Sequence, residues 1–144
     1  MAQALEIRIL GGVFALARLP REFAVPATSS GAFSATLVSE HGVTLVCQEE
    51  LAPAEAELSA GFRCLTVASV FELESVGIVA AVTQSIAEAG ISLFAYSTWE
   101  TDYILVQERD LPAAVQALTR AGHRVVDTWG DRGAAVNPGS AARP

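Results

Sequence analysis

The second half of the chain places its apolar residues at the spacing of amphipathic helices. This pattern predicts a helix over residues 76–89, with Ser75 capping its start and Gly90 ending it. Its buried positions recur three and four residues apart, at Ile78, Val82 and Ile86. A second helix is expected from the capping residue Asp110 to Gly122, with a buried stripe formed by Leu111, Val115 and Leu118.

Strand patterns surround these two helices. Residues 62–70 form an apolar run, and residues 91–97 alternate between two faces. The segment 98–101 then turns the chain, and residues 102–107 return as a partner strand, with residues 124–126 as a last short strand. The resulting order is βαββαβ. Two helices on one face of a four-stranded antiparallel sheet make the ferredoxin-like layout.

The first half of the chain has strand periodicity and little helix. Strands are predicted over four segments, namely residues 5–10, 13–19, 33–38 and 43–47, of which the first two form a hairpin across Gly11 and Gly12. Residues 49–60 are polar and acidic and are expected to be a connector, with a helical turn after Pro53. We interpret this half as a shorter, degenerate version of the second.

The expected fold class is therefore α+β, with two tandem ferredoxin-like units whose antiparallel sheets carry helices on one face. The first unit would span residues 1–60 and the second residues 61–129. Residues 130–144 are rich in Gly, Ala, Arg and Pro, without an apolar period, and are predicted to be a flexible tail.

Charge and composition narrow the classes of function. The chain has 144 residues, is 51% hydrophobic and carries a net charge of −7, which disfavours a nucleic-acid partner. It contains no apolar stretch long enough for a membrane span and no signal sequence, so a cytoplasmic protein is expected. Cys47 and Cys64 lie in apolar runs and are predicted to be buried, reduced thiols.

The most informative chemistry lies between Gly77 and Asp102. The free N–H groups at a helix start favour an anion, so the backbone after Gly77 would suit a carboxylate. Asp102 begins a strand, where an acid is unusual, and could accept a charge-assisted bond from an ammonium group. Because the element order brings both features to neighbouring strand ends, the sequence predicts a site for a free amino acid.

Each of these residues also has a structural explanation. Gly77 could allow the helix to pack closely on its strand, and Asp102 could cap its own hairpin turn. Ser97 and Thr98 could bond a ligand or the hairpin backbone. Trp99 could shield a pocket, make a dimer contact or pack on its own domain. The sequence leaves these alternatives open.

Other polar residues give weaker signals. Glu72 and Glu74 could attract a ligand with a cationic side chain, such as arginine or lysine, or could form a solvated loop. His41 and His123 lack the spacing of metal ligands and are expected at the surface. No nucleophile motif, phosphate loop or cysteine pair is recognisable. We therefore expect no catalysis, no cofactor and no metal. The hypothesis of a small enzyme has no recognisable set of catalytic residues to support it.

Several of these segments resemble the ACT domain family. The residues that carry the resemblance are Gly77-Ile78, the run from Ala87 to Ile91, Ser97-Thr98, Thr101-Asp102 and Ile104-Leu105-Val106. The resemblance covers about residues 60–127 and extends weakly over residues 5–60, where residues 43–47 resemble the family's first-half strand. The chain is most similar to small bacterial proteins with two tandem ACT-like units. These look like the regulatory region of aspartate kinases and are similar to the cytosolic arginine sensor of animal cells.

The resemblance implies a non-catalytic amino-acid sensor that holds its ligand at an ACT–ACT interface, either between units or between subunits. It implies a homodimer and a regulated enzyme as a further partner. The ligand-binding residues it implies are Glu72, Ser75, Val76, Gly77, Ile78, Ser97, Thr98, Thr101 and Asp102.

This chain departs from the family pattern ahead of Gly77. Relatives carry a Gly-Pro pair at the strand end, then Asp, and a Thr just before the glycine. The corresponding residues here are Ser69-Val70, Glu72 and Val76, so the threonine hydroxyl is missing. The departure supports an alternative function, a protein–protein interaction module with a decayed ligand pocket.

Overall fold

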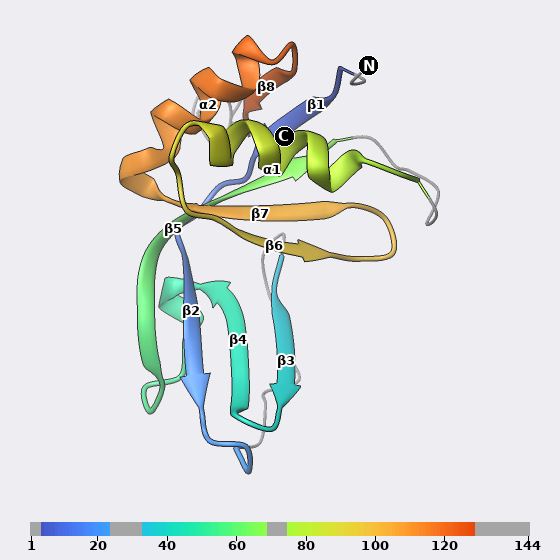
Figure 1. Cartoon of the computed structure of the whole chain (residues 1–144). Helices are drawn as coiled ribbons and strands as arrows, with labels where there is room; N and C mark the ends of the chain where they lie inside the picture. Colours follow the sequence, from blue (N-terminus) through green and yellow to red (C-terminus); the bar gives the residue numbers. More distant parts are fainter. Residues whose placement is uncertain (1–3, 24–32, 69–74, 129–144) are drawn as a thin grey trace. The chain divides into compact units, whose positions relative to one another are not determined.

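The computed structural model describes residues 4–23, 33–68 and 75–128 (Figure 1). The chain divides into two compact units, one of Gly12–Phe62 and one of Met1–Gly11 with Arg63–Pro144. We call the first the sheet unit and the second the helical unit. Strand β5 (Glu57–Val67) contributes its first residues to the sheet unit and its last to the helical unit. The loop acids Glu72 and Glu74, the pair Ser69-Val70 and the predicted tail lie outside the described residues.

The helical unit has the predicted βαββαβ order from β5 onward. Its further elements are β1 (Glu6–Ile9), α1 (Ile78–Glu88), β6 (Phe94–Ser97), β7 (Asp102–Gln107), the 3-10 turn η2 (Glu108–Asp110), α2 (Leu111–Arg120) and β8 (Arg124–Asp127). The strands lie in the order β6-β7-β5-β1-β8. This is an α+β, ferredoxin-like arrangement, which confirms the predicted fold class for this unit.

The N-terminal strand takes a different place from the one expected. We predicted a hairpin between residues 5–10 and 13–19 within the first unit, but β1 lies between β5 and β8 in the helical unit. It pairs antiparallel with β5 and parallel with β8, so this sheet is not wholly antiparallel. The physical reason is burial: Ile7 and Ile9 are 1% and 3% exposed within the core that the helices cover.

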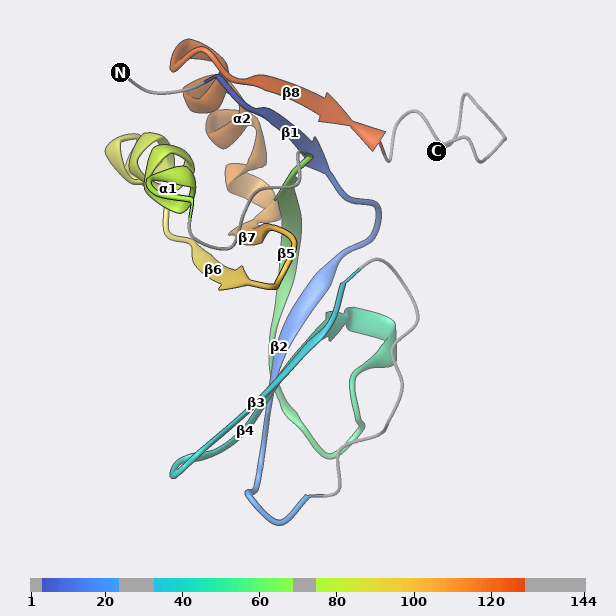
Figure 2. The ribbon, with the colours of Figure 1, turned by 90° about the vertical axis from the view of Figure 1, so that its right-hand side faces the viewer.

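Both helices pack on the same face of this sheet (Figure 2). Val82 and Ile86 of α1 and Leu118 of α2 are buried, as their helical spacing predicted. The other predicted positions, Ile78, Leu111 and Val115, are partly buried at the edge of the same core. Full burial of a side chain of this size contributes roughly 1.5–3 kcal/mol, so these positions fix the two helices on the sheet.

The ends of α1 are formed by backbone and not by side chains. Gly77 is the N-cap, and no side chain of the described residues makes a cap hydrogen bond there, so the prediction that Ser75 caps this helix was wrong. At the other end the Gly90 N–H donates to the Ala87 carbonyl (2.9 Å) and the Ile91 N–H to the Ile86 carbonyl (3.3 Å). This bonding pattern is a Schellman motif and confirms Gly90 as the stop.

The sheet unit consists of antiparallel strands. They are β2 (Phe14–Leu19), β3 (Ala35–Ser39), β4 (Gly42–Gln48) and the first part of β5, in the order β3-β4-β2-β5. The described part of this unit has no α-helix, only the 3-10 turn η1 (Glu49–Leu51). The predicted connector 49–60 was partly wrong, since its helical turn comes before Pro53 and residues 57–60 are strand. All side chains of residues 57–60 are exposed, so no hydrophobic alternation revealed the strand.

Two predictions about buried chemistry have opposite outcomes. Cys47 and Cys64 are buried free thiols, as predicted, and burial raises the pKa of Cys64 to about 12. His123 is only 5% exposed, so its expected surface position was wrong. Its Nδ1 accepts a hydrogen bond from the Leu5 N–H (3.1 Å), which ties the start of β1 to the segment before β8.

None of the helices in the described residues is long and apolar enough to cross a membrane.

Candidate functional site

The start of α1 presents an open backbone. Gly77 has a φ of +86°, a left-handed conformation that glycine adopts without steric cost. A Cβ at Gly77 would meet no atom within 4 Å, so close packing does not explain this glycine. The first intrahelical bond is the one from the Ala81 N–H to the Gly77 carbonyl (2.9 Å). The N–H groups of residues 78–80 precede it and have no acceptor within the helix.

The hairpin between β6 and β7 is held by its own side chains. The Thr98 N–H donates to the Thr101 carbonyl (2.8 Å), and the Thr98 hydroxyl donates to that same carbonyl (3.1 Å). The Thr98 Oγ1 also accepts from the backbone N–H groups of Glu100 (3.3 Å) and Thr101 (3.2 Å). Of the two explanations for Thr98, bonding of the hairpin backbone is the one realised in this structure.

Two further hydroxyls attach the hairpin to β5. Thr101 donates to the Val67 carbonyl (2.9 Å), and Thr66 donates to the Asp102 carbonyl (3.0 Å). The Ser97 hydroxyl donates to Oδ1 of Asp102 (2.6 Å) and so orients the carboxylate. One Asp102 oxygen is thus fixed by its own hairpin, and the other can accept a donor from a bound molecule.

The helix start and the hairpin share one hollow of about 320 Å³. Its lining residues are Ser75, Gly77, Ile78, Val79, Ala80, Ser97, Thr98, Trp99, Glu100, Thr101 and Asp102. The structure therefore brings together most residues of the predicted site. Val76 is not part of the lining and is 93% exposed, and Glu72 lies outside the described residues.

Four lining residues were absent from the predicted ligand-binding set. Val79 and Ala80 belong to the first turn of α1, and the free amides expected after Gly77 could have pointed to them. No signal in the sequence pointed to Glu100, because a charged residue in a turn is ordinarily solvated. Trp99 lines the hollow while 73% of it is exposed, so it packs little on its own domain.

The hollow is acidic. Among the residues that the structure describes, the charged residues of its lining are Glu100 and Asp102, and none is basic. Burial raises the pKa of the neighbouring tyrosines Tyr96 and Tyr103, so both phenols stay neutral at pH 7. Within residues 4–23, 33–68 and 75–128 no group of His, Cys, Asp and Glu could hold a metal ion. The described groups provide amide donors and carboxylate acceptors, which is the chemistry of binding a zwitterion.

Comparisons with known proteins concern the family and the fold of this chain. A model of the ACT domain family matches residues 57–120, which include β5, α1, β6, β7 and α2. A solved protein from Agrobacterium tumefaciens is 28% identical, with a TM-score of 0.81 over 88% of this chain and 95% of that chain. A Vibrio cholerae protein of unknown function, described as a possible transport protein, is 28% identical with a TM-score of 0.64, over 83% of this chain and 91% of that chain.

A more distant likeness concerns the fold alone. The ligand-free regulatory subunit of aspartate kinase from Thermus thermophilus is 11% identical, with a TM-score of 0.57 over 78% of this chain and 93% of that chain. A search of curated proteins finds no significant match to this chain.

Proposed function

Because this chain carries an ACT domain, a regulatory amino-acid-binding module, we propose that it is a non-catalytic sensor of a free amino acid. The observation that supports the proposal most strongly is the hollow shared by the first turn of α1 and the β6–β7 hairpin. Its volume of about 320 Å³ lies at the small end of the range for small-molecule sites, which suits a metabolite.

The proposed pose follows from charge. The ligand's α-carboxylate accepts hydrogen bonds from the N–H groups of residues 78–80, where the helix dipole also favours a negative charge. Its α-ammonium donates to the Asp102 oxygen that Ser97 does not engage. Ser75, Ser97 and Thr101 line the space between these two groups and complete the polar wall.

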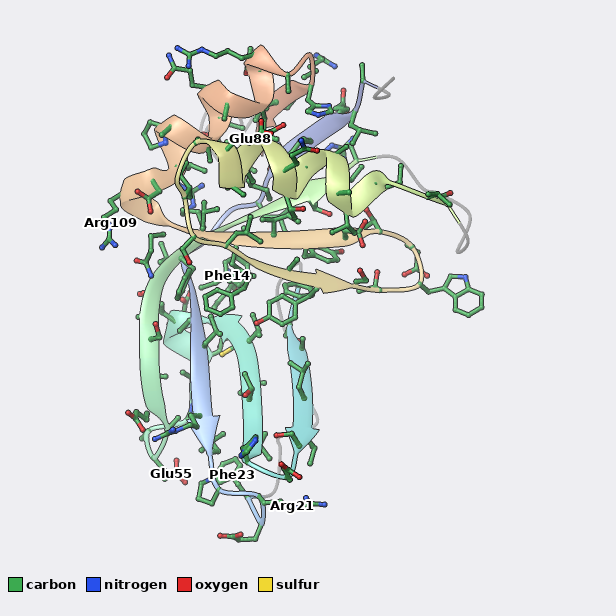
Figure 3. The ribbon with its side chains drawn as sticks, in the orientation of Figure 1. Phe14, Arg21, Phe23, Glu55, Glu88 and Arg109 are labelled. Atoms are coloured by element: carbon green, nitrogen blue, oxygen red, sulfur yellow. The ribbon has the colours of Figure 1, made fainter. Side chains whose placement is uncertain are left out.

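A thermal-shift and calorimetric screen of the common amino acids tests this proposal. A ligand at 100 times its Kd stabilises the folded protein by about 2.7 kcal/mol, which raises the Tm measurably. Asp102→Asn should weaken binding about tenfold or more, because it removes the charge that faces the ammonium. Glu55→Gln is the matched control, since Glu55 is an exposed carboxylate of the sheet unit (Figure 3).

Two results would count against the sensor. The first is that no amino acid at millimolar concentration raises the Tm of the wild-type protein. The second is that the Asp102→Asn and Glu55→Gln variants bind the amino acid equally well, which would show that Asp102 does not contact the ligand.

We further propose that two copies pair over the mouth of this hollow, so that the ligand is held at an ACT–ACT interface. Val76 and Trp99 support this, since both are large apolar side chains, 93% and 73% exposed, beside the hollow. Sedimentation should show a dimer, and the double change Val76→Ser with Trp99→Ser should shift it toward monomer. A wild-type monomer at saturating ligand would contradict the pairing.

The alternative is a protein–protein interaction module with a decayed pocket. It is favoured by two observations: the Ser97 and Thr98 hydroxyls already bond within the hairpin, and Val76 stands where relatives carry a threonine. Under this alternative no amino acid stabilises the protein, while a bound partner enzyme is released by Trp99→Ser. A Tm rise with any one amino acid would instead favour the sensor.

A further inference from the structure

We infer that the amino acid bound in this hollow carries a cationic side chain, a guanidinium or ammonium group, which Glu100 and Trp99 receive; the inference rests on the proposed function. A free amino acid brings one carboxylate and one ammonium, which the α1 amides and Asp102 match. The described lining of the hollow has a further carboxylate, that of Glu100, and no basic side chain.

Glu100 is available for a ligand. Its backbone N–H bonds to Thr98, but within the described residues its carboxylate makes no hydrogen bond or ion pair. An anionic side chain in the hollow would face two carboxylates and would be repelled. A neutral side chain would gain nothing from the Glu100 charge, whereas a cationic side chain would gain an ion pair with it.

The turn fixes Glu100 and Trp99 as neighbours at its tip. Thr98 accepts hydrogen bonds from two backbone N–H groups of this turn, so the backbone that carries both residues is well defined. Trp99 is 73% exposed although it is the largest apolar residue type, and it lines the hollow beside Glu100. An indole face attracts ammonium and guanidinium groups, so the pair combines a carboxylate with a cation–π surface.

Isosteric ligand pairs give the test. Calorimetric titrations would compare arginine with citrulline, and lysine with 2-aminoheptanoic acid, at 50 mM and 500 mM salt. Each cation should bind about fivefold to tenfold more tightly than its neutral isostere at low salt, and the ratio should fall at high salt because Glu100 is exposed.

Matched variants show which residues cause the preference for a cationic side chain. Glu100→Gln should lower the cation-to-isostere ratio to about threefold, the share that the cation–π contact with Trp99 provides, and leave the affinity for the two neutral ligands unchanged. Trp99→Leu should lower the ratio by about threefold through the lost cation–π contact. Glu55→Gln in the sheet unit should leave the ratio as it is in the wild-type protein.

The outcomes separate this inference from the proposed function. If citrulline or 2-aminoheptanoic acid binds as tightly as its cationic partner, the inference is overturned and the amino-acid sensor stands. A preference that Glu100→Gln leaves as large as in the wild-type protein overturns the role given to Glu100. If none of the amino acids binds, the sensor itself fails and the inference fails with it.

Discussion

The helical unit and the sheet unit each contain a hollow of similar size, about 320 Å³ and about 300 Å³, but the two differ in chemistry. The hollow of the sheet unit is lined by strand residues: Leu16, Ala17, Arg18, Thr44, Glu57, Leu58 and Ser59. Its charged side chains already form an ion pair, since Nη2 of Arg18 lies 2.6 Å from Oε1 of Glu57. In the helical unit, the carboxylates of Glu100 and Asp102 face no cation among the described lining residues.

The difference shows what a helix start adds to a sheet. Within antiparallel ladders the backbone N–H groups bond to neighbouring strands, so the sheet unit offers few free donors. The first turn of α1 offers amides without intrahelical acceptors at the edge of its hollow. We therefore propose the recognition site for a carboxylate in the helical unit, and the sheet unit's hollow serves as its internal control.

The largest expected effect concerns the helix-covered core. Leu118 is fully buried, whereas Leu58 of the sheet unit is 47% exposed. Leu118→Ala should lower the free energy of unfolding by about 3 kcal/mol, and Leu58→Ala by less than about 1 kcal/mol. Urea denaturation followed by circular dichroism at 222 nm measures both. Equal losses of unfolding free energy in the two variants would show that the core covered by the helices is not the better packed one.

Two glycines give the next comparison. Gly77→Ala should cost about 1–2 kcal/mol, because only the left-handed φ of +86° opposes the new side chain. Gly42→Ala should cost more, because its Cβ would also lie 2.7 Å from the Leu19 carbonyl oxygen. The same denaturation experiment ranks the two. A larger loss at Gly77 would mean that its surroundings are more crowded than the structure shows.

The buried thiols predict a pH dependence. Burial raises the pKa of Cys64 from 9.0 to about 12. The folded state therefore keeps a proton that the unfolded chain loses above pH 9, and the stability that this contributes is lost as the pH rises from 9 toward 12. The wild-type protein should lose about 1 kcal/mol more than Cys64→Ala between pH 9 and pH 10.

Cys47 of the sheet unit is the control for this measurement. Burial also raises its pKa, with Glu50 adding to the effect, but less strongly than for Cys64. Cys47→Ala should therefore change the pH slope less than Cys64→Ala. The same slope for the wild-type protein and Cys64→Ala would contradict the burial of this thiol.

The smallest expected effect lies at the ion pair of the sheet unit. The side chains of Arg18 and Glu57 are 74% and 72% exposed, so Arg18→Gln should cost less than about 1 kcal/mol. Amino-acid affinity should not change. A loss of affinity in this variant would transfer the binding site to the sheet unit's hollow.

Local patterns in the sequence predicted the helical unit well. The helical period located α1 and α2, and alternation after a turn gave β7 as residues 102–107, the bounds that the structure shows. The meeting of Gly77 with Asp102 also followed from local patterns, because the βαββαβ order itself places a helix start near a hairpin.

Long-range pairing and polar strands were beyond prediction. The partners of β1 depend on β8, which lies more than a hundred residues further along the chain, and no local pattern encodes that pairing. The burial of His123 has the same origin, since its hydrogen-bond partner is Leu5. The start of β5 carries exposed side chains on both faces, so it gave no hydrophobic alternation.

The most direct test of the account is an amide NMR titration of the full chain with an amino acid that raises its Tm. We predict shifts for the N–H signals of residues 78–80 and 97–102, and no shifts for Leu16, Thr44 and Ser59 around the second hollow. Shifts confined to the sheet unit, or no shifts at saturating ligand, would contradict a binding site formed by the α1 start and the hairpin.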